Sequence, residues 1–215
     1  MQNINKVAVI GGTGKSGTFL VKELLRQNFK IKVLIRNPEK VPPVHPNLEV
    51  IMGDVLDKNA IQSLISDCDG LISMLGTGIP YSEPTIFSKA TRLILEALSK
   101  SRIYRYIVIT GLNVDTATDQ KREVTQAATD WMYANYPIST QDRQLEYELL
   151  CASKLDWTLV RLPLIGQTDE APEISVSLGD CPGQHISATS LAKFLIASLR
   201  DEKHIREAPF IANID

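Results

Sequence analysis

Short apolar runs alternate with amphipathic segments along the first half of the chain, and this pattern predicts strands that alternate with helices. Five nearly continuous apolar runs have the length of buried strands, namely Val7–Ile10, Ile31–Ile35, Leu48–Met52, Leu71–Leu75 and Tyr106–Thr110. Between these runs, apolar residues recur at helical spacing, as at Leu20 and Leu24 or at Ile94 and Leu98. Strands that are apolar on both faces indicate a parallel sheet covered by helices on both sides. We therefore expect a doubly wound α/β fold with a parallel sheet.

Capping residues and prolines mark several of the expected boundaries. Asp57 has the residue type of a helix N-cap, and Pro84 suits the first turn of the long helix before the fifth strand. Prolines recur between residues 38 and 46, so we predict an irregular loop that runs to about Asn47.

The second half of the chain has a weaker pattern. Residues 113–129 are polar and rich in threonine, and we predict a loop or a lid there. The other expected elements are a helix to about Ser153, a strand at Trp157–Leu162 that Pro163 ends, an edge strand at Ile174–Leu178, a helix capped by Ser187 and a last strand at Phe210–Ile214. No repeat or linker interrupts this series, so a single domain over residues 1–215 is expected.

The composition narrows the classes of partner. Hydrophobic residues make up 44% of the chain and the formal net charge is −2, so there is no basic footprint for nucleic acid or an anionic membrane. No apolar run approaches the ~20 residues that span a bilayer, and the first residues lack the apolar core of a signal peptide. Cys68, Cys151 and Cys181 have neither metal nor disulfide spacing. We expect a cytoplasmic monomer or weak homodimer that acts on a small molecule and holds no metal.

Glycines at a regular spacing follow the first predicted strand and lead into the first predicted helix. Gly11, Gly14 and Gly17 have the spacing G-x-x-G-x-x-G, which is typical of a turn that binds a dinucleotide. Gly11 allows the chain to reverse, Gly14 allows a pyrophosphate to approach the main chain, and Gly17 allows the helix to pack closely on the strand. The N-terminus of that helix would offer its amide groups to the phosphates.

A phosphate-binding P-loop is the competing interpretation, because Gly14-Lys15-Ser16 has the sequence of its end. The P-loop motif G-x-x-x-x-G-K-[ST] also needs a glycine at position 9. The chain has Val9 there, inside the predicted strand, so the spacing favours the dinucleotide site.

Ligands of doubly wound sheets bind beyond the carboxyl ends of the strands. This rule selects six stretches, which are residues 11–16, Arg36–Asn37, Gly53–Val55, Leu75–Thr77, Thr110–Gly111 and Pro163–Leu164. Thr13 and Ser16 can hydrogen-bond phosphate oxygens, and Ser16 can equally be a helix-start residue alone. Asp54 can accept a hydrogen bond from the adenine amino group, or it can stabilise a turn with Gly53.

Arg36 bears on the choice of dinucleotide. An NAD site places a carboxylate at the end of the second strand, whereas the 2′-phosphate of NADP attracts a cation. The chain has Arg36 at this position and no acidic residue until Glu39. A guanidinium group can bind a phosphate through two parallel hydrogen bonds. We predict that NADP(H) is preferred over NAD(H); a solvated surface arginine is the alternative interpretation.

Four segments together resemble the atypical short-chain dehydrogenase/reductases: Ile10–Gly17, Val33–Arg36, Gly53–Leu56 and Leu75–Thr77. The chain resembles the biliverdin reductase B / flavin reductase group most, and it resembles the NmrA-like NAD(P)-binding proteins to a lesser degree. The resemblance implies a Rossmann fold with Gly11, Thr13, Gly14, Lys15 and Ser16 at the pyrophosphate, Arg36 at the 2′-phosphate, Asp54 and Val55 at the adenine, Leu75, Gly76 and Thr77 along the middle of the cofactor, and Thr110 near the nicotinamide. Pro163, at the end of the sixth strand, is also expected at the cofactor.

The chain departs from this group at the residues that handle protons. It has no Tyr-x-x-x-Lys pair, and Gly111 and Leu164 stand where the flavin reductase relatives have serine and histidine. Thr110 is therefore the one polar group that we expect at the nicotinamide, as a catalytic residue. Four aromatic residues, Tyr81, Trp131, Tyr133 and Tyr136, are candidates for the pocket rim, with ordinary packing as the alternative.

Two functions are compatible with these features. The first is an NADPH-dependent reductase that passes hydride to a planar acceptor such as a flavin or a quinone. The second is a non-catalytic NADP(H)-binding sensor of the NmrA-like type, which the missing acid–base residues favour. In either case residues of about 1–112 form the cofactor half, and residues of about 113–215 form a small C-terminal substrate lobe. The segment 113–140 is expected to carry the substrate preference.

Overall fold

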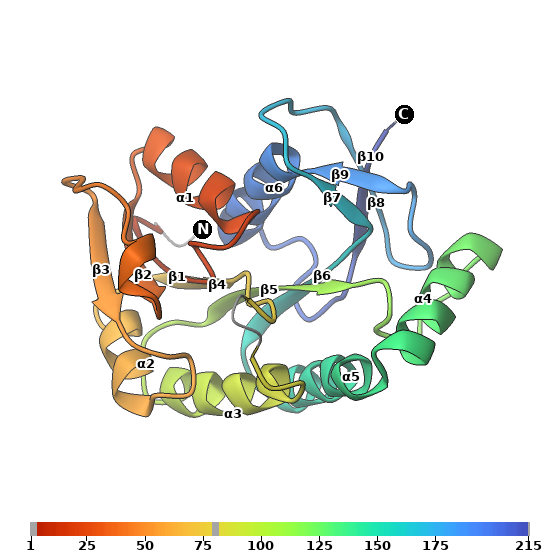
Figure 1. The fold of residues 1–215 in the computed structure, drawn as a ribbon, viewed down its shortest axis with the longest axis horizontal. Helices are drawn as coiled ribbons and strands as arrows, with labels where there is room; N and C mark the ends of the chain where they lie inside the picture. The colour runs from red at the N-terminus through yellow and green to blue at the C-terminus, as the bar shows by residue number, and fades with distance from the viewer. Residues whose placement is uncertain (1–3, 79–81, 215) are drawn as a thin grey trace.

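An eight-stranded sheet forms the centre of the protein (Figure 1), which a computed structural model describes over residues 4–78 and 82–214. The strand order is β3-β2-β1-β4-β5-β6-β10-β8, and every neighbouring pair is parallel except β10–β8. The strands are β1 Lys6–Ile10, β2 Lys30–Ile35, β3 Leu48–Met52, β4 Gly70–Ser73, β5 Arg105–Gly111, β6 Asp156–Leu162, β8 Ile174–Ser177 and β10 Phe210–Asn213. This is the order of a doubly wound sheet, as predicted.

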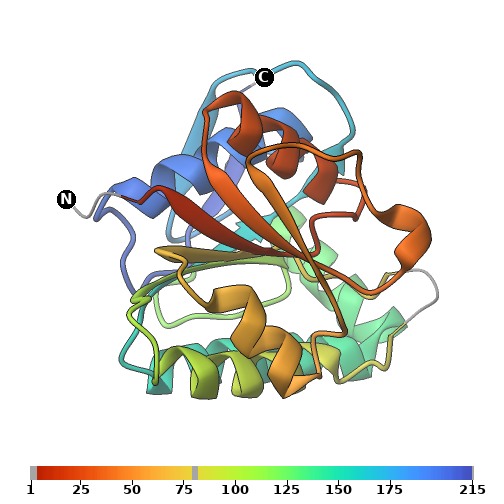
Figure 2. The same ribbon diagram turned by 90° about the vertical axis from the view of Figure 1, so that its left-hand side faces the viewer.

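Helices cover both faces of the sheet (Figures 1 and 2). On one face lie α1 Gly17–Arg26 and α6 Ala188–Arg200; on the other lie α2 Lys58–Ile65, α3 Ile86–Leu98 and α5 Pro137–Ala152. Every described helix is too short or too polar to cross a bilayer.

Alternate residues of each strand supply two apolar layers. In β1, Val7 and Val9 pack toward α1 and α6, whereas Ala8 and Ile10 pack toward α2 and α3. Both layers are fully buried; Leu20 of α1, for example, has no exposed surface. Each such leucine contributes about 2 kcal/mol of hydrophobic free energy. Because a strand that turned over would exchange the side chains of its two faces, burial in two layers fixes which face of each strand packs on which helices.

The helix caps follow the sequence closely. Asp57 Oδ1 accepts hydrogen bonds from the backbone N–H groups of Asn59 and Ala60, at 2.8 and 3.3 Å, at the start of α2. Ser187 Oγ accepts from the Ser190 N–H at 2.8 Å at the start of α6. Helix α3 begins at Ile86, two residues beyond Pro84. The irregular loop after β2 contains one 3₁₀ turn, Pro38–Lys40, which Asn37 caps.

The prediction of a loop over residues 113–129 is wrong in its second half. Helix α4 occupies Glu123–Asn135 and extends away from the sheet (Figure 1). Only Thr125 and Thr129 of this helix are buried, so it has no apolar stripe that could have revealed it in the sequence. A second difference is a two-stranded parallel pair, β7 Leu164–Gly166 and β9 His185–Ser187, whose strands are too short to give a periodic signal.

Residues 113–122 form a loop that Arg161 of β6 holds against the sheet. The Arg161 side chain is 0% exposed, and its Nη1 donates to both carboxylate oxygens of Asp119, at 2.6 and 2.9 Å. Its other donors reach the carbonyl oxygens of Ala208 and Leu178. A buried guanidinium that is paired in this way is costly to disturb, which argues against free opening of this loop as a lid.

A cluster of charges closes the amino-terminal edge of the sheet. Lys32 of β2 is buried, and its Nζ lies 2.8 Å from Asp67 Oδ1 and 3.4 Å from Glu49 Oε1. Lys6 of β1 lies 2.8 Å from the other oxygen of Asp67. Hydrogen bonds from Lys32 and Lys6 lower the pKa of Asp67 to about 2. The exposed Asp67 carboxylate thus pairs with the buried ammonium group of Lys32.

We expect Asp67→Asn to lower the free energy of unfolding by about 1 kcal/mol near neutral pH, a value reduced for the exposure of Asp67. Because its pKa is lower in the folded than in the unfolded chain, this contribution is complete above about pH 4 and is lost as the pH falls toward 2. Urea unfolding should therefore show a wild-type-to-variant difference that shrinks in acid. Glu202→Gln, at an exposed position, is the control; a difference that grows in acid would contradict the assignment.

Candidate functional site

Two of the three glycines of the G-x-x-G-x-x-G spacing, Gly11 and Gly17, are required by backbone packing. Gly11 has φ +76°, and a Cβ there would overlap the carbonyl group of Met74, at the end of β4. A Cβ on Gly17 would overlap the Gly11 carbonyl. The N–H of Gly14 donates to the same carbonyl at 3.0 Å and closes the turn. The predicted roles of Gly11 in the turn and of Gly17 in close packing are confirmed.

Gly76 has no such structural reason to be glycine. A Cβ on this residue would meet no atom within 4 Å, and its φ is not positive. It lies after β4, beside the glycine turn, where its missing side chain leaves open space. A ligand that needs to approach the main chain is a sufficient reason for glycine at this position.

A cavity of about 800 Å³ opens at the carboxyl ends of β1, β2, β4, β5 and β6. Thirteen residues that the sequence singled out all line it: Gly11, Thr13, Gly14, Lys15, Ser16, Arg36, Asp54, Val55, Leu75, Gly76, Thr77, Thr110 and Pro163. The cavity spans the point between β1 and β4 at which the strand order reverses, which is where doubly wound sheets bind ligands. Its volume lies in the range of small-molecule sites.

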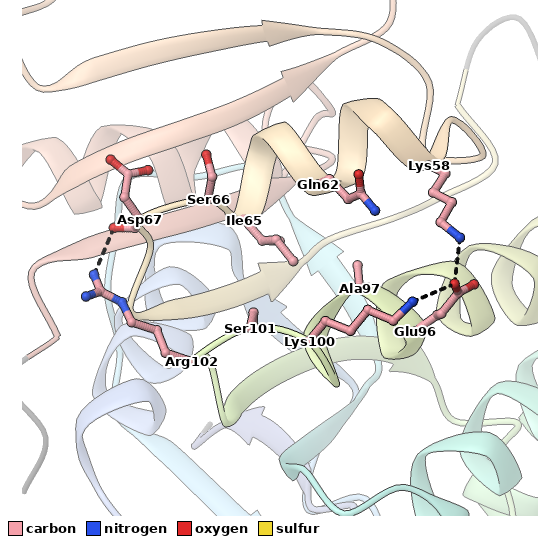
Figure 3. A pocket seen from close by; sticks show the side chains of 10 residues that line it. All are labelled: Lys58, Gln62, Ile65, Ser66, Asp67, Glu96, Ala97, Lys100, Ser101 and Arg102. Carbon is pink, nitrogen blue, oxygen red and sulfur yellow. Dashed lines mark hydrogen bonds and ion pairs between the residues drawn. The ribbon is translucent and has the colours of Figure 1, made fainter.

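A smaller cavity of about 360 Å³ lies between α2 and α3 (Figure 3), away from these strand ends. Each of its charged side chains has a partner: Glu96 Oε1 accepts from Lys58 Nζ at 2.6 Å and from Lys100 Nζ at 3.3 Å. Asp67 pairs with Lys32, and Arg102 pairs with Asp69. A mutually neutralised, exposed surface of this kind has no unsatisfied group to attract a ligand.

Arg36 and Asp54 lie beside each other at the ends of β2 and β3. Arg36 Nη1 donates to Ser82 Oγ at 3.0 Å and lies 3.8 Å from Asp54 Oδ2. Asp54 Oδ1 accepts a hydrogen bond from the Leu56 N–H at 2.9 Å, so Asp54 stabilises the turn after β3, as one of its two interpretations predicts. The Arg36 side chain is 44% exposed, and a phosphate could reach it from the cavity.

Two unsatisfied polar groups flank Gly111 at the end of β5. Thr110 is 4% exposed and Asn113 is 1% exposed, and neither Thr110 Oγ1 nor Asn113 Nδ2 has a hydrogen-bond partner among the described residues. A Cβ on Gly111 would lie 2.7 Å from Asn113 Oδ1, so the Asn113 amide fills the space of the side chain that residue 111 lacks. Buried polar groups without partners are rare. Of these two residues Thr110 lines the cavity, where a ligand or water could complete its bonding.

Sequence reasoning did not single out Asn113 or Arg143. Arg143 of α5 lines the cavity, where its Nη2 donates to the Leu75 carbonyl at 2.7 Å and its Nη1 to the Ile109 carbonyl at 3.1 Å. The same Nη1 is paired with Glu146 at 2.7 Å. Arg143 therefore ties α5 to the ends of β4 and β5. An Arg–Glu pair at i,i+3 on a helix was the available signal, and such pairs are common on helix surfaces.

The aromatic candidates for the rim lie elsewhere or outside the described residues. Trp131 and Tyr136 are exposed near the end of α4, where their rings meet edge to face at a centroid distance of 5.7 Å. The described lining of the cavity contains no tryptophan or tyrosine. Tyr81 lies outside the described residues. Within the described ranges, no three His, Cys, Asp or Glu side chains form a group that could hold a metal ion.

Comparison with known proteins relates most of the chain to one family. The sequence profile of a family described as NAD(P)H-binding matches residues 11–202. A short-chain dehydrogenase/reductase from Veillonella parvula, solved in complex with NADP, is 19% identical with a TM-score of 0.81 and covers 98% of this chain and 95% of its own. A candidate NADH-flavin reductase from Streptococcus pneumoniae is 18% identical with a TM-score of 0.77, over 99% and 100% of the two chains.

Curated relatives are longer proteins. Anthocyanidin reductase from Arabidopsis thaliana is 22% identical, and the match covers 86% of this chain and 64% of that protein. An uncharacterised protein from Sinorhizobium fredii is 39% identical over 31% of this chain and 16% of its own length. The chain thus spans less than two thirds of the curated relatives that it matches.

The two classes of glycine should respond differently to an added methyl group. We expect Gly17→Ala to lower the free energy of unfolding by about 2–4 kcal/mol, because its Cβ overlaps backbone. Gly76→Ala should change it by less than about 0.5 kcal/mol, because its Cβ enters open space. Denaturant unfolding of both variants makes the comparison. A large loss of stability in Gly76→Ala would show that packing, rather than a ligand, requires this glycine.

Proposed function

Because the chain belongs to the NAD(P)H-binding family, we propose that it is an NADPH-dependent reductase that passes hydride to a planar small-molecule acceptor, such as a flavin or a quinone. The observation that carries the proposal is the cavity, which joins the glycine turn, Arg36 and the end of β5 in one continuous space. Each part of a dinucleotide then has suitable chemistry: donors for the pyrophosphate at the turn, a cation for the 2′-phosphate at Arg36, and a wall of strand ends at β4 and β5 for the nicotinamide.

The turn would hold the pyrophosphate. Gly14, Lys15 and Ser16 line the cavity immediately before α1, whose ten residues point their amide groups and positive dipole end in this direction. Lys15 is exposed and adds a positive charge. These groups would hold the pyrophosphate without contributing to the choice between NAD and NADP.

Arg36 would decide that choice. Its guanidinium group lies at the end of β2, where a 2′-phosphate is expected, and Ser82 and Asp54 hold it in place. Asp54 and Val55 would flank the adenine. A 2′-hydroxyl would offer Arg36 only a neutral partner, whereas a phosphate would form charge-assisted hydrogen bonds.

The opposite end would receive the nicotinamide, which supplies the hydride when bound in its reduced form. Leu75, Gly76 and Thr77 would line the middle of the cofactor, and Thr110 and Pro163 would lie near the ring. Arg143 would act through the strand ends, since it holds the carbonyl groups of Leu75 and Ile109. Positioning of two planar groups against each other is the main contribution that such a site can make.

A non-catalytic NADP(H)-binding sensor is the second candidate. The ionisable residues in the described cavity lining are Lys15, Arg36, Lys40, Asp54 and Arg143, and none is a histidine, tyrosine or cysteine. The Thr110 hydroxyl is buried, and the Leu164 side chain is exposed. A site that lacks a protein proton donor would favour binding over turnover unless water protonates the acceptor.

The two candidates separate in one assay. We expect purified protein to oxidise NADPH when a panel of flavins and quinones is supplied, as followed by the loss of NADPH absorbance. Each acceptor is also incubated with NADPH alone, to subtract the uncatalysed reaction. Tight NADPH binding without turnover across the panel would contradict the reductase and support the sensor.

The choice of cofactor is tested by charge reversal. Arg36→Asp should raise the Kd for NADPH about 10- to 100-fold, because charge-assisted hydrogen bonds to the phosphate are lost. The Kd for NADH should change much less, and calorimetry can measure both. Lys30→Asp is the matched control, since it makes the same charge change at the opposite end of β2. Equal losses for the two cofactors would contradict the role of Arg36.

A further inference from the structure

The segment that follows β7, residues 167–173, reaches the glycine turn from the far end of the sequence. Gln167 Nε2 donates a hydrogen bond to Ser16 Oγ at 3.1 Å, although 151 residues separate the two. Two residues later, Asp169 pairs with Lys22 of α1 at 2.6 Å. The segment lies on the face of the sheet that α1 and α6 cover (Figure 2).

Three hydroxyl groups at the start of α6 fix the backbone of this segment. They donate to its carbonyl oxygens, in the pairs Thr189–Thr168 at 2.9 Å, Ser187–Glu170 at 2.6 Å and Ser190–Pro172 at 2.8 Å. Gln167 therefore projects toward the turn from a backbone that is already ordered. A group that is held in place in this way loses little entropy when a ligand binds beside it.

The hydroxyl of Ser16 is not used to cap α1. Ser16 occupies the N-cap position with helical backbone angles, and its side chain makes no capping hydrogen bond. Among the described residues, the bond from Gln167 is the one hydrogen bond that this hydroxyl makes. Since an amide N–H can only donate, Ser16 Oγ is the acceptor, and its own proton remains available for another partner.

We propose that Gln167 is a positioning residue of the phosphate-binding turn: by donating to Ser16 Oγ, it directs the Ser16 proton toward a phosphate oxygen of the bound dinucleotide. The proposal rests on the proposed cofactor site. Ser16 lines the cavity, and the described lining does not include Gln167, so Gln167 acts through Ser16. Hydrogen bonds in such a chain polarise one another, so the donor strength of Ser16 increases.

The test compares substitutions that differ in what residue 167 can donate. Gln167→Ala should raise the Kd for NADP⁺ about 3- to 10-fold, the loss of one neutral hydrogen bond. Gln167→Glu should raise it further, about 10- to 100-fold, because a carboxylate draws the Ser16 proton to itself and repels the phosphates. Asp169→Asn is the matched control in the same segment; it weakens the exposed contact with Lys22, and its Kd should stay within about twofold of the wild type.

A double-mutant cycle shows whether Gln167 acts through Ser16. In the presence of Ser16→Ala, the further change Gln167→Ala should leave the Kd for NADP⁺ unchanged. Calorimetry measures binding, and thermal unfolding of the single Gln167 variants should match the wild type because Gln167 is on the surface.

Three results would overturn the inference. Additive effects of Ser16→Ala and Gln167→Ala would show that Gln167 acts independently of Ser16, and a Glu variant that binds like the wild type would show that donation is irrelevant. Either result would leave the proposed function intact. If the wild-type protein bound no NADP⁺ at all, the proposed function would fail and this inference with it.

Discussion

The contact between the start of α1 and the strand ends at its base is the constraint on which the site depends. Gly11 reverses the chain against the Met74 carbonyl, and Gly17 places α1 directly on the carbonyl of Gly11. The backbone at the start of α1 thus lies against the backbone at Gly11, and Gly11 lies against the backbone of Met74. The amide groups of the first turn, the space beside Gly76 and the end of β2 consequently share one cavity. Larger residues at positions 11 and 17 would move the first turn of α1 away from the ends of β1 and β4.

Much of this arrangement follows from local sequence. The apolar runs mark the strands because each is buried on both faces, and Asp57 and Ser187 mark helix starts because their side chains accept from the first turn. The rule that ligands bind beyond the carboxyl ends of strands needs only the order of elements, so it placed residues as distant as Thr13 and Pro163 on one cavity.

The parts that the sequence does not reveal are set by contacts between distant segments. Helix α4 has no apolar stripe, and β7 and β9 pair across a gap of about twenty residues with only three residues each. Arg143 reads as a surface helix residue until the structure places it under the carbonyl groups of Leu75 and Ile109. Gln167 is equally ordinary in sequence, and only the structure shows its hydrogen bond to Ser16, at the other end of the chain.

The packing of Asn113 against Gly111 makes the residue types that each position can accept depend on the other position. The Asn113 amide occupies the volume that any side chain at residue 111 would need. A serine or alanine at position 111 is therefore sterically disfavoured as long as asparagine is present at 113, whereas a smaller residue at 113 opens the space first. Position 111 can therefore acquire a side chain only if the Asn113 side chain moves aside or is replaced by a smaller one.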